Sequence, residues 1–354
     1  MKTTTQKNLL YKPKAECMDG VYALDHVLGC SHGCKYPCNA YLAAKKLGQV
    51  GSYEDWCEPK LVENAIELLE RELTSARREP VRRVHVCFAA DPFMYGQELV
   101  QAATSGVLNL VNRKCDIPVT LLTKGAYPRV HRRPLRYANG DVVDAVWFER
   151  PHGGSLEGPL HPGNEYGISL SSLDEGFRER WEPGAAPCAE RIASLKALHD
   201  AGCRTWVSME PWPSPTILAA ATGTRDDAAH EASYGTSIAE VLWMMRGFKA
   251  LDELLEEVSF VDKITFGRWD YGSSSEWEDY YNSCTDNVRT FCAVRNIECV
   301  IEEEADILGS LEVDGEGASM DGGILRWNPI YVDELGVIDD EETDADPKPW
   351  DSRR

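Results

Sequence analysis

Strand-like and helix-like segments alternate along most of this chain, and this alternation limits the folds that it can adopt. Short apolar runs bounded by Gly, Pro or Asp are typical of strands, and the segments between them repeat apolar residues at helical spacing. The expected strands are 21–29, 81–90, 118–125, 166–172, 203–213, 259–267 and 298–304. The expected helices are 39–48, 60–78, 96–114, 188–202, 237–258 and 278–296. Such alternation predicts an α/β fold with a parallel sheet, either open or curled into a barrel.

Two segments interrupt the alternation, and the chain ends on an acidic stretch. Residues 138–165 and 213–235 are rich in Gly, Pro, Ala and Asp, so we expect insertions or long loops there. The final stretch, DDEETDADPKPWDSRR, is expected to be solvated and disordered.

Composition narrows the class of protein. The chain has 354 residues, 43% of them hydrophobic, which is enough for a large core. A net charge of −21 argues against nonspecific DNA binding, although 77–83 and 124–137 are locally basic. No apolar run approaches a membrane span, and the first residues lack the apolar core of a signal peptide. We therefore expect a cytoplasmic protein, whose twelve cysteines serve as free thiols or metal ligands instead of disulfides.

Three of the cysteines share one short loop, GCSHGCKYPCNAY (29–41). Cys30, Cys34 and Cys38 are four residues apart, and glycines precede the first two. Structural zinc usually takes four protein ligands, and His32 lies where closure around the same ion would be strained. A cubane iron–sulfur cluster held by three thiolates keeps one iron open to another ligand. The loop favours such a cluster, with a structural metal as the alternative.

Polar residues stand where several of the expected strands end. They are Asp91 in AADPF, Lys124 in LLTKG, Ser169 and Ser171 in ISLSS, and Glu210 in SMEPWP. The carboxyl ends of parallel strands meet at one edge of a sheet, where sites of α/β proteins form. These residues are therefore candidates for one pocket, although strand ends are often polar for structural reasons alone.

The cysteine loop resembles the cluster loop of the radical S-adenosylmethionine (SAM) enzymes, in particular the branch related to spore photoproduct lyase. AADPF and LLTKG are similar to that branch's second and third strand ends. The segment 166–213 is similar to its Ser-bearing strand, Glu-Pro element, Glu-Arg helix start and Pro-rich strand end, in that order. The resemblance covers roughly residues 20–305. One departure is the spacing CxxxCxxxC in place of CxxxCxxC, with Pro37 as the apparent insertion, and its effect stays open.

The resemblance implies a partial (β/α)6 barrel over residues 21–305, with an N-terminal extension (1–20) and an acidic C-terminal extension (306–354). Cys30, Cys34 and Cys38 would bind three irons of a [4Fe–4S] cluster, and SAM would chelate the fourth. Lys124 and Ser169 match positions that hold the SAM carboxylate and ribose, and Arg191 is a weaker candidate for the carboxylate. The further cofactor candidates are Tyr36, Asp91 and Glu210. For Glu182, a salt bridge that braces the helix of Arg191 and a functional role are both open.

The resemblance also implies reductive cleavage of SAM to a 5′-deoxyadenosyl radical, with electrons from flavodoxin or ferredoxin. The YPC loop is similar to a subgroup found beside a three-Cys-motif partner protein, which is then a possible partner. Three hypotheses remain: a radical enzyme acting on nucleic acid or a nucleotide, one acting on protein or a small molecule, and a non-catalytic iron–sulfur or zinc protein. Cys87, near the end of an expected strand, is a candidate hydrogen donor.

Overall fold

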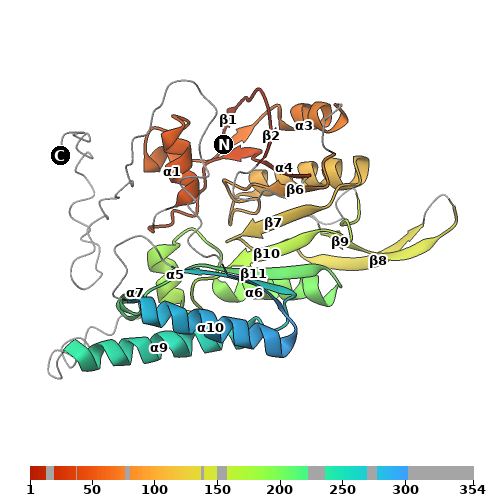
Figure 1. Cartoon of the computed structure of the whole chain (residues 1–354). Coiled ribbons are helices and arrows are strands. Elements are labelled where there is room, and N and C mark those ends of the chain that lie inside the picture. Colours follow the sequence, from red (N-terminus) through yellow and green to blue (C-terminus); the bar gives the residue numbers. More distant parts are fainter. Residues whose placement is uncertain are drawn as a thin grey trace.

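A computed structural model describes residues 1–12, 20–36, 38–75, 80–136, 139–149, 158–221, 236–268 and 277–301 (Figure 1). Its centre is an eight-stranded sheet in the order β13-β12-β11-β10-β7-β6-β3-β2. From the β2 edge the strands are β2 (Leu10–Tyr11), β3 (Val21–Leu24), β6 (Arg83–Val86), β7 (Val119–Thr123), β10 (Glu165–Ser169), β11 (Arg204–Trp212), β12 (Lys263–Arg268) and β13 (Glu298–Ile301).

Seven strands of the sheet, β3 to β13, are parallel and follow one another in chain order, and only β2 is antiparallel. Crossovers between parallel strands are right-handed as a rule, and here all of them step in the same direction, so the connecting helices are expected on one face of the sheet. The helices of the connections are α3 (Ala65–Thr74), α4 (Glu98–Leu108), α6 (Cys188–Asp200), α9 (Thr236–Glu257) and α10 (Glu278–Arg295). Accordingly, α6 contacts β10 and β11, and α10 contacts β12 and β13.

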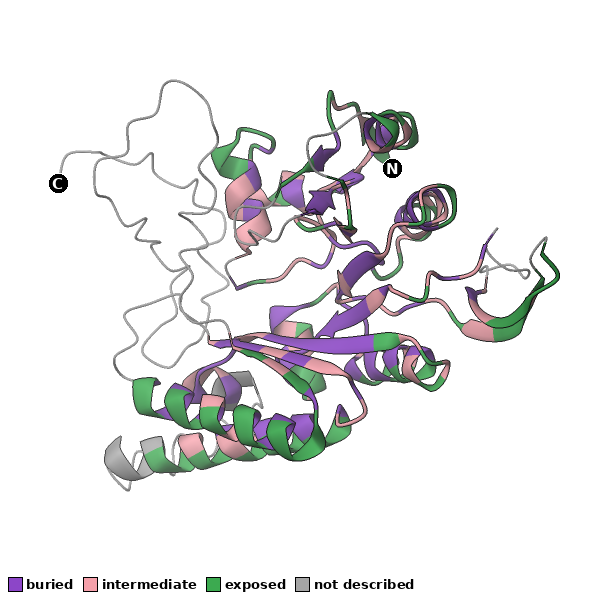
Figure 2. Cartoon of the chain, turned by 45° about the vertical axis from the view of Figure 1, so that its right-hand side comes forward, coloured by how far each residue is buried: buried purple, intermediate pink, exposed green. Residues whose placement is uncertain are grey.

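The strand register separates an apolar face from a polar one. Ile168, Val207 and Ile264 are neighbours on adjacent strands, and all are fully buried. One residue further along, Ser169, Ser208 and Thr265 are neighbours in the same way. Successive side chains of a strand point to opposite faces, so these three hydroxyls lie on the other face of the sheet. The strands at the centre of the fold are largely buried (Figure 2).

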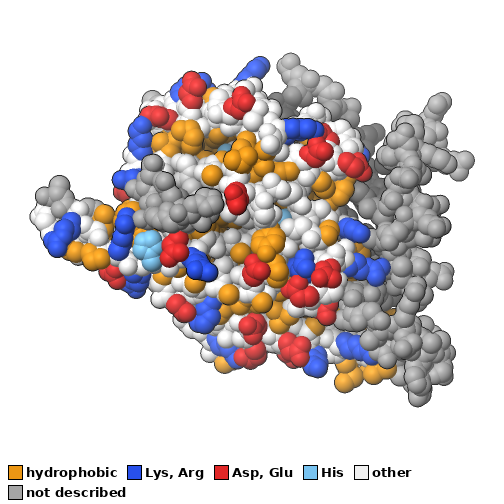
Figure 3. Space-filling view, turned by 180° about the vertical axis from the view of Figure 1, so that it is seen from behind, with side chains coloured by type: hydrophobic (Ala, Val, Ile, Leu, Met, Phe, Trp, Pro, Cys, Tyr) orange, Lys and Arg blue, Asp and Glu red, His pale blue; other side chains and the backbone are white. Residues whose placement is uncertain are grey.

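A ribbon takes the place of a crossover helix between β7 and β10. Among the described strands, β8 (Val130–Arg136) and β9 (Val142–Phe148) pair only with each other, and their far end stands clear of the body (Figure 1). At the base, Tyr127 stacks on Phe148, and both rings meet Tyr166 edge to face. Lys and Arg side chains lie along the ribbon (Figure 3). These aromatic contacts join the ribbon to the main sheet.

Most of the predicted strands and helices are confirmed within a few residues, and one prediction was wrong. Residues 60–62, expected to begin a helix, form β5 (Lys60–Val62), because they pair with β1 (Lys2–Thr4) and β4 (Val27–Leu28) in a small sheet. Residues 142–148, in a segment expected to be an insertion or a long loop, form a strand that was not predicted, β9, because the apolar run VVDAVWF has β8 as a partner.

Shorter elements complete the described chain. They are α1 (Asn39–Lys46), α2 (Tyr53–Trp56), the π-helix η1 (Asn109–Lys114), α5 (Glu175–Trp181) and α7 (Pro215–Ala221). The predicted acidic tail, most of the expected loop 213–235 and Pro37 lie outside the described residues. Within the described ranges, no helix is both long enough and apolar enough to cross a bilayer.

Candidate functional site

The cysteine loop lies between β4 and α1, at the carboxyl end of the first parallel strand. Gly29 begins it with φ +92°, and a Cβ there would come 2.5 Å from the carbonyl oxygen of Trp56. The next amide, of Cys30, donates to that same carbonyl at 2.9 Å. Only glycine allows this close approach, so the first glycine of the motif fixes where the loop starts.

The three thiols are partly buried and interact with one another electrostatically. Burial, followed by the charges of Asp91 and Cys34, raises the pKa of Cys30. Burial also raises the pKa of Cys34, to about 12, and that of Cys38. Among the described residues, no group of three or more His, Cys, Asp or Glu side chains is arranged to hold a single metal ion. The thiols are therefore protonated unless a positively charged group lies among them.

Asp91, which follows the second parallel strand, fixes the neighbouring strand end and the loop together. Its carboxylate accepts from Thr123 Oγ1 at 2.7 Å, from the Lys124 amide at 2.7 Å and from the Phe93 amide at 2.8 Å. His32 Nδ1 of the cysteine loop lies 3.5 Å from it. Both carboxylate oxygens are engaged by the protein, which makes Asp91 a residue that positions Lys124 and the loop.

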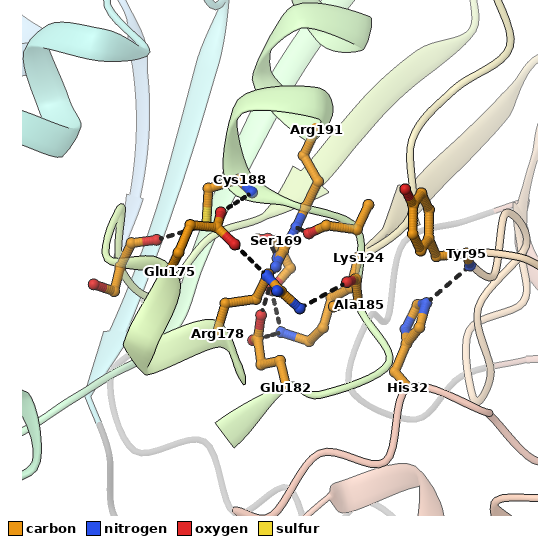
Figure 4. Close-up of polar contacts among 12 residues, drawn as sticks. His32, Tyr95, Lys124, Ser169, Glu175, Arg178, Glu182, Ala185, Cys188 and Arg191 are labelled. Atoms are coloured by element: carbon orange, nitrogen blue, oxygen red, sulfur yellow. Dashed lines mark hydrogen bonds and ion pairs between the residues drawn. The ribbon is translucent and has the colours of Figure 1, made fainter. Parts of the chain in front are cut away.

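Glu182 is the centre of a buried polar cluster (Figure 4). Lys124 Nζ donates to its Oε1 at 2.7 Å, and the Tyr36 hydroxyl donates to the same oxygen at 2.6 Å. Arg191 Nη2 pairs with Oε2 at 2.9 Å. Burial alone would raise the pKa of Glu182, but the charges of Lys124 and Arg191 outweigh it and lower the pKa to about 2. The carboxylate is therefore ionised and shared by two cations.

The two cations of the cluster differ in what they can offer to a ligand. Arg191 is completely buried, with Nε donating to the Ala186 carbonyl at 2.8 Å and Nη1 to the Ser169 carbonyl at 2.7 Å. Lys124 Nζ donates to Ser169 Oγ at 2.7 Å besides Glu182, and its side chain is 16% exposed. A third N–H of Lys124 has no hydrogen-bond partner among the described residues. Lys124 is therefore the cation that a ligand can reach, whereas Arg191 lies behind Glu182 in the protein interior.

The segment 181–186 holds this cluster against the cysteine loop. The amide of Gly184 donates to the carbonyl of His32 at 2.8 Å, and the amide of Lys35 donates to the carbonyl of Trp181 at 2.9 Å. A Cβ on Gly184 would lie 2.4 Å from the Ser31 carbonyl oxygen, which leaves no room for a side chain. The amide of residue 186 donates to the carbonyl of the strand-end lysine, residue 124, at 2.9 Å. One short segment thus contacts both the loop and the strand end that carries the lysine.

A row of hydroxyls continues from Ser169 across the sheet. Ser208 and Thr265 occupy the same level and the same face of β11 and β12, and Ser208 is almost fully buried. Thr265 Oγ1 is buried without a hydrogen-bond partner among the described residues. The sequence could have indicated this polar face, because Ser208 and Thr265 alternate with apolar residues in WVSM and KITF. The polar face beside Lys124 is therefore wider than the strand ends alone predicted.

The structure brings Lys124, Ser169 and Arg191 together with Tyr36 of the cysteine loop, while their ligand roles stay predictions. Asp91 joins them through the Lys124 amide. Glu210, the last of the cofactor candidates, precedes a cis peptide bond to proline within β11, and its Oε1 is buried.

Sequence reasoning left the role of Glu182 open and missed that it links Lys124 to Tyr36. Glu182 follows a helix, α5, so no strand pattern points to it. Its salt bridge with Arg191 is present, and the contact with Lys124 adds a second one that was not expected.

Cys87 pairs with a histidine that the sequence did not single out. Its Sγ lies 3.3 Å from His26 Nδ1, and His26 Nε2 lies 2.9 Å from Thr104 Oγ1. Thr104 gives its own hydrogen to backbone carbonyls, so it accepts from Nε2–H and leaves Nδ1 as the acceptor for the thiol. Burial lowers the pKa of His26 to about 4 and raises that of Cys87. The pair is therefore a neutral thiol and a neutral imidazole.

Comparisons with known proteins give likenesses of fold at low sequence identity. No protein-family model matches the chain, and no curated protein matches it. A mutant of spore photoproduct lyase with bound AdoMet and dinucleoside spore photoproduct is similar over 79% of this chain and 75% of its own, with 12% identity and a TM-score of 0.46. Spore photoproduct lyase complexed with dinucleoside spore photoproduct covers 84% and 80%, with 12% identity and a TM-score of 0.47. Streptococcus suis SuiB bound to S-adenosylmethionine covers 69% and 43%, with 12% identity and a TM-score of 0.35.

Proposed function

We propose that this protein is a radical SAM enzyme that holds a [4Fe–4S] cluster at Cys30, Cys34 and Cys38. When bound, the cluster and SAM supply reductive cleavage to a 5′-deoxyadenosyl radical, which abstracts hydrogen from a substrate that is still unknown. The observation that carries the proposal is the fixed contact between a three-thiol loop and the Lys124–Ser169 cluster through residues 181–186. The fold proposed with it is a partial barrel related to the (β/α)6 type, built from the seven parallel strands.

The number and type of donors in the loop suit such a cluster, in which each thiolate would bind a different iron, so the thiols need not converge on a single ion. Burial and mutual repulsion keep the three thiols protonated on their own, and a cationic iron–sulfur core removes that penalty by lying among them. Three thiolates leave one iron open, which is where the amino and carboxylate groups of SAM would bind.

The neighbouring residues fit the rest of SAM. The outward N–H of Lys124 suits a carboxylate, and Ser169 and the hydroxyls beside it suit a ribose or a polar substrate group. The ring of Tyr36, a residue of the loop, has its centroid 5.3 Å from Lys124 Nζ. Arg191 has no part in direct binding in this arrangement, because its side chain is completely buried behind Glu182.

Anaerobic reconstitution with iron and sulfide tests the proposal. The full-length protein should bind one [4Fe–4S] cluster, SAM should change its electron paramagnetic resonance spectrum, and dithionite should yield 5′-deoxyadenosine. Ala at Cys30, Cys34 or Cys38 should abolish all three signals. Cys115→Ala is the matched control, since Cys115 is also only partly buried and lies next to η1, remote in sequence from the loop. Zinc alone in the loop under strictly anaerobic conditions would contradict the proposal.

Cys57 needs its own variant because of where the structure places it. Burial and, to a smaller extent, the charge of Cys38 raise its pKa, while a hydrogen bond with Tyr53 lowers it. The Tyr53 hydroxyl also donates to the Cys34 carbonyl. If Cys57→Ala removes iron while Cys115→Ala does not, the ligand set of the proposal is wrong.

The alternative is a non-catalytic iron–sulfur or zinc protein that uses the same cysteines structurally. It predicts metal binding without any 5′-deoxyadenosine, so the dithionite assay separates it from the enzyme. Substrate classes need a second screen, with nucleic acid, nucleotide and protein substrates offered to the reconstituted enzyme. Flavodoxin or ferredoxin as reductant, and a three-Cys-motif protein as partner, are part of the proposal and can be tested in the same assay.

A further inference from the structure

We infer that Arg191 acts as an electrostatic positioning residue: its buried charge offsets Glu182, so that Lys124 keeps a net positive charge for an anionic ligand group. The inference rests on the proposed function only for the identity of that ligand, the SAM carboxylate. It assigns to Arg191 a role at a distance, in place of direct contact with the ligand.

The charges of the cluster lead to this conclusion. Lys124 and Glu182 alone, 2.7 Å apart, would be a neutral pair with little attraction for an anion. Arg191, 2.9 Å from the other carboxylate oxygen, adds a second positive charge, and these three side chains together carry +1. The nearby carboxylate of Asp91 accepts from the backbone amide of Lys124 and is not paired with its ammonium. Side-chain exposure is 1% for Arg191 and 3% for Glu182, but 16% for Lys124. The surplus charge therefore faces outward only at Lys124.

Burial argues against the simpler role, in which Arg191 itself contacts the ligand, because its side chain is only 1% exposed. Its Nε and Nη1 donate to the carbonyls of Ala186 and Ser169, and its Nη2, which has no hydrogen-bond partner among the described residues, forms an ion pair with Glu182 (Figure 4). A ligand carboxylate could reach the guanidinium only by displacing Glu182 or by opening the start of α6. The ammonium of Lys124 needs no such rearrangement.

Four forms of the protein distinguish charge from packing. They are the parent, Arg191→Gln, Glu182→Gln and the double variant Glu182→Gln/Arg191→Gln. If Arg191 acts through its charge, Arg191→Gln should weaken the attraction of Lys124 for anions and Glu182→Gln should strengthen it. The double variant should then attract anions about as strongly as the parent. A purely structural role predicts loss in both single variants and no recovery in the double.

The first measurement needs no cofactor. The full-length protein is acetylated with N-hydroxysuccinimide acetate, which is neutral, and with its sulfonated, anionic form, and labelling of Lys124 is followed by peptide mass spectrometry. The labelling rate with the anionic reagent is divided by the rate with the neutral reagent. The intrinsic reactivity of the Lys124 amine affects both rates equally, so their ratio reports the local electrostatic potential. We expect a ratio roughly three- to tenfold lower in Arg191→Gln, higher in Glu182→Gln, and within about threefold of the parent in the double variant.

The second measurement is SAM binding to the anaerobically reconstituted forms, with decarboxylated SAM as the control ligand. A charge about 10 Å from an anion, at an effective dielectric constant near 20, changes affinity by roughly ten- to twentyfold. Arg191→Gln should lose about that much for SAM and much less for the decarboxylated compound. Arg191→Lys keeps the charge and should stay near the parent in both measurements.

The outcomes separate the inference from the proposed function. An unchanged labelling ratio in Arg191→Gln, or a double variant as weak as that single one, overturns the inference whatever SAM does. If the labelling ratios follow the expected order but no form binds SAM, the inference is supported and the proposed function is contradicted. Circular dichroism of each form checks folding, and if Arg191→Gln does not fold, Arg191→Lys against Glu182→Gln still decides between charge and packing.

Discussion

Two glutamates of this protein each form ion pairs with several cations, and they lie at opposite ends of the sheet. Glu165, at the start of β10, lies 3.1 Å from Lys263, 3.3 Å from Arg204 and 3.8 Å from Arg83. Its partners are 15 to 44% exposed. Glu182, at the carboxyl end, has partners at 2.6 to 2.9 Å and is itself 3% exposed.

How far each group is exposed to water decides how strongly its ion pairs affect stability. Water screens the Glu165 group, so it joins the starts of four strands with little energy in any one pair. The Glu182 group is sheltered, so each charge depends on the others and removing one leaves another uncompensated. Of these two groups, only the Glu182 group places a cation beside the cysteine loop. That cation is Lys124, whose third N–H has no hydrogen-bond partner among the described residues.

The largest expected effect comes from removing each carboxylate charge in turn. Glu182→Gln leaves two buried cations facing each other and should lower the unfolding free energy by about 3 kcal/mol at pH 7. Glu165→Gln removes a partly screened charge and should cost about 1 kcal/mol or less. Urea unfolding of the protein without cofactors measures both. Equal losses in the two variants would remove the distinction between the clusters.

Acid should affect the two glutamates unequally as well. The pKa of Glu182 falls from 4.5 to about 2 on folding, so its stabilisation is complete above pH 4.5 and disappears as the pH falls towards 2. The advantage of the parent over Glu182→Gln should thus shrink by about 3 kcal/mol across that window. Burial alone would raise the pKa of Glu165, but the charges of Lys263 and Arg83 outweigh it and lower that pKa too. Because the partners of Glu165 are more exposed to water, we expect a smaller change there, and stability measured from pH 7 to 2 compares the variants.

A methyl group tests how closely the backbone packs at each end. In Gly184→Ala the Cβ would meet backbone atoms of Ser31 and His32 at 2.4 and 2.9 Å, so the cysteine loop must move. In Gly163→Ala, near Glu165, the contacts are side-chain atoms at 3.2 Å, which can adjust. We expect a loss of about 2 kcal/mol and reduced iron content for the first, and near-parent values for the second. Full iron content in Gly184→Ala would show that the loop is not held there.

The smallest expected effect concerns two tyrosines that donate to glutamates. Tyr36→Phe removes a buried 2.6 Å hydrogen bond to Glu182 and should cost about 1.5 kcal/mol. Tyr95→Phe removes exposed bonds of 3.1 and 3.3 Å to Glu190 and should cost about 0.5 kcal/mol or less. Thermal unfolding ranks the two variants. A larger loss at Tyr95 would mean that burial does not set the strength of these contacts.

The sequence predicted those parts of the fold and site that depend on repeated local patterns. Apolar runs located the parallel strands, and the rule that strands end at one edge placed Lys124 beside Ser169. Contacts between segments that are far apart in the chain leave no such pattern in the sequence. Glu182 reaches Tyr36 across 146 residues, and the strand at 60–62 depends on a partner at residues 2–4. The ribbon was missed because its two strands are joined by Gly and Asn, which also mark plain loops.

The ribbon has one further consequence, for behaviour at high concentration. Near its tip the ribbon has no third strand among the described residues, which leaves its outer edges open to pairing with other chains, a route to aggregation. Nearer the base, the Leu160 amide donates to the Val146 carbonyl of β9 at 2.8 Å. Strand β8 limits this, since Pro134 has no N–H to give and three arginines lie along the same strand. Strand β9 instead exposes Val142 and Val143 near the tip. We therefore expect self-association to begin along β9, and the substitution Val142→Lys to suppress it.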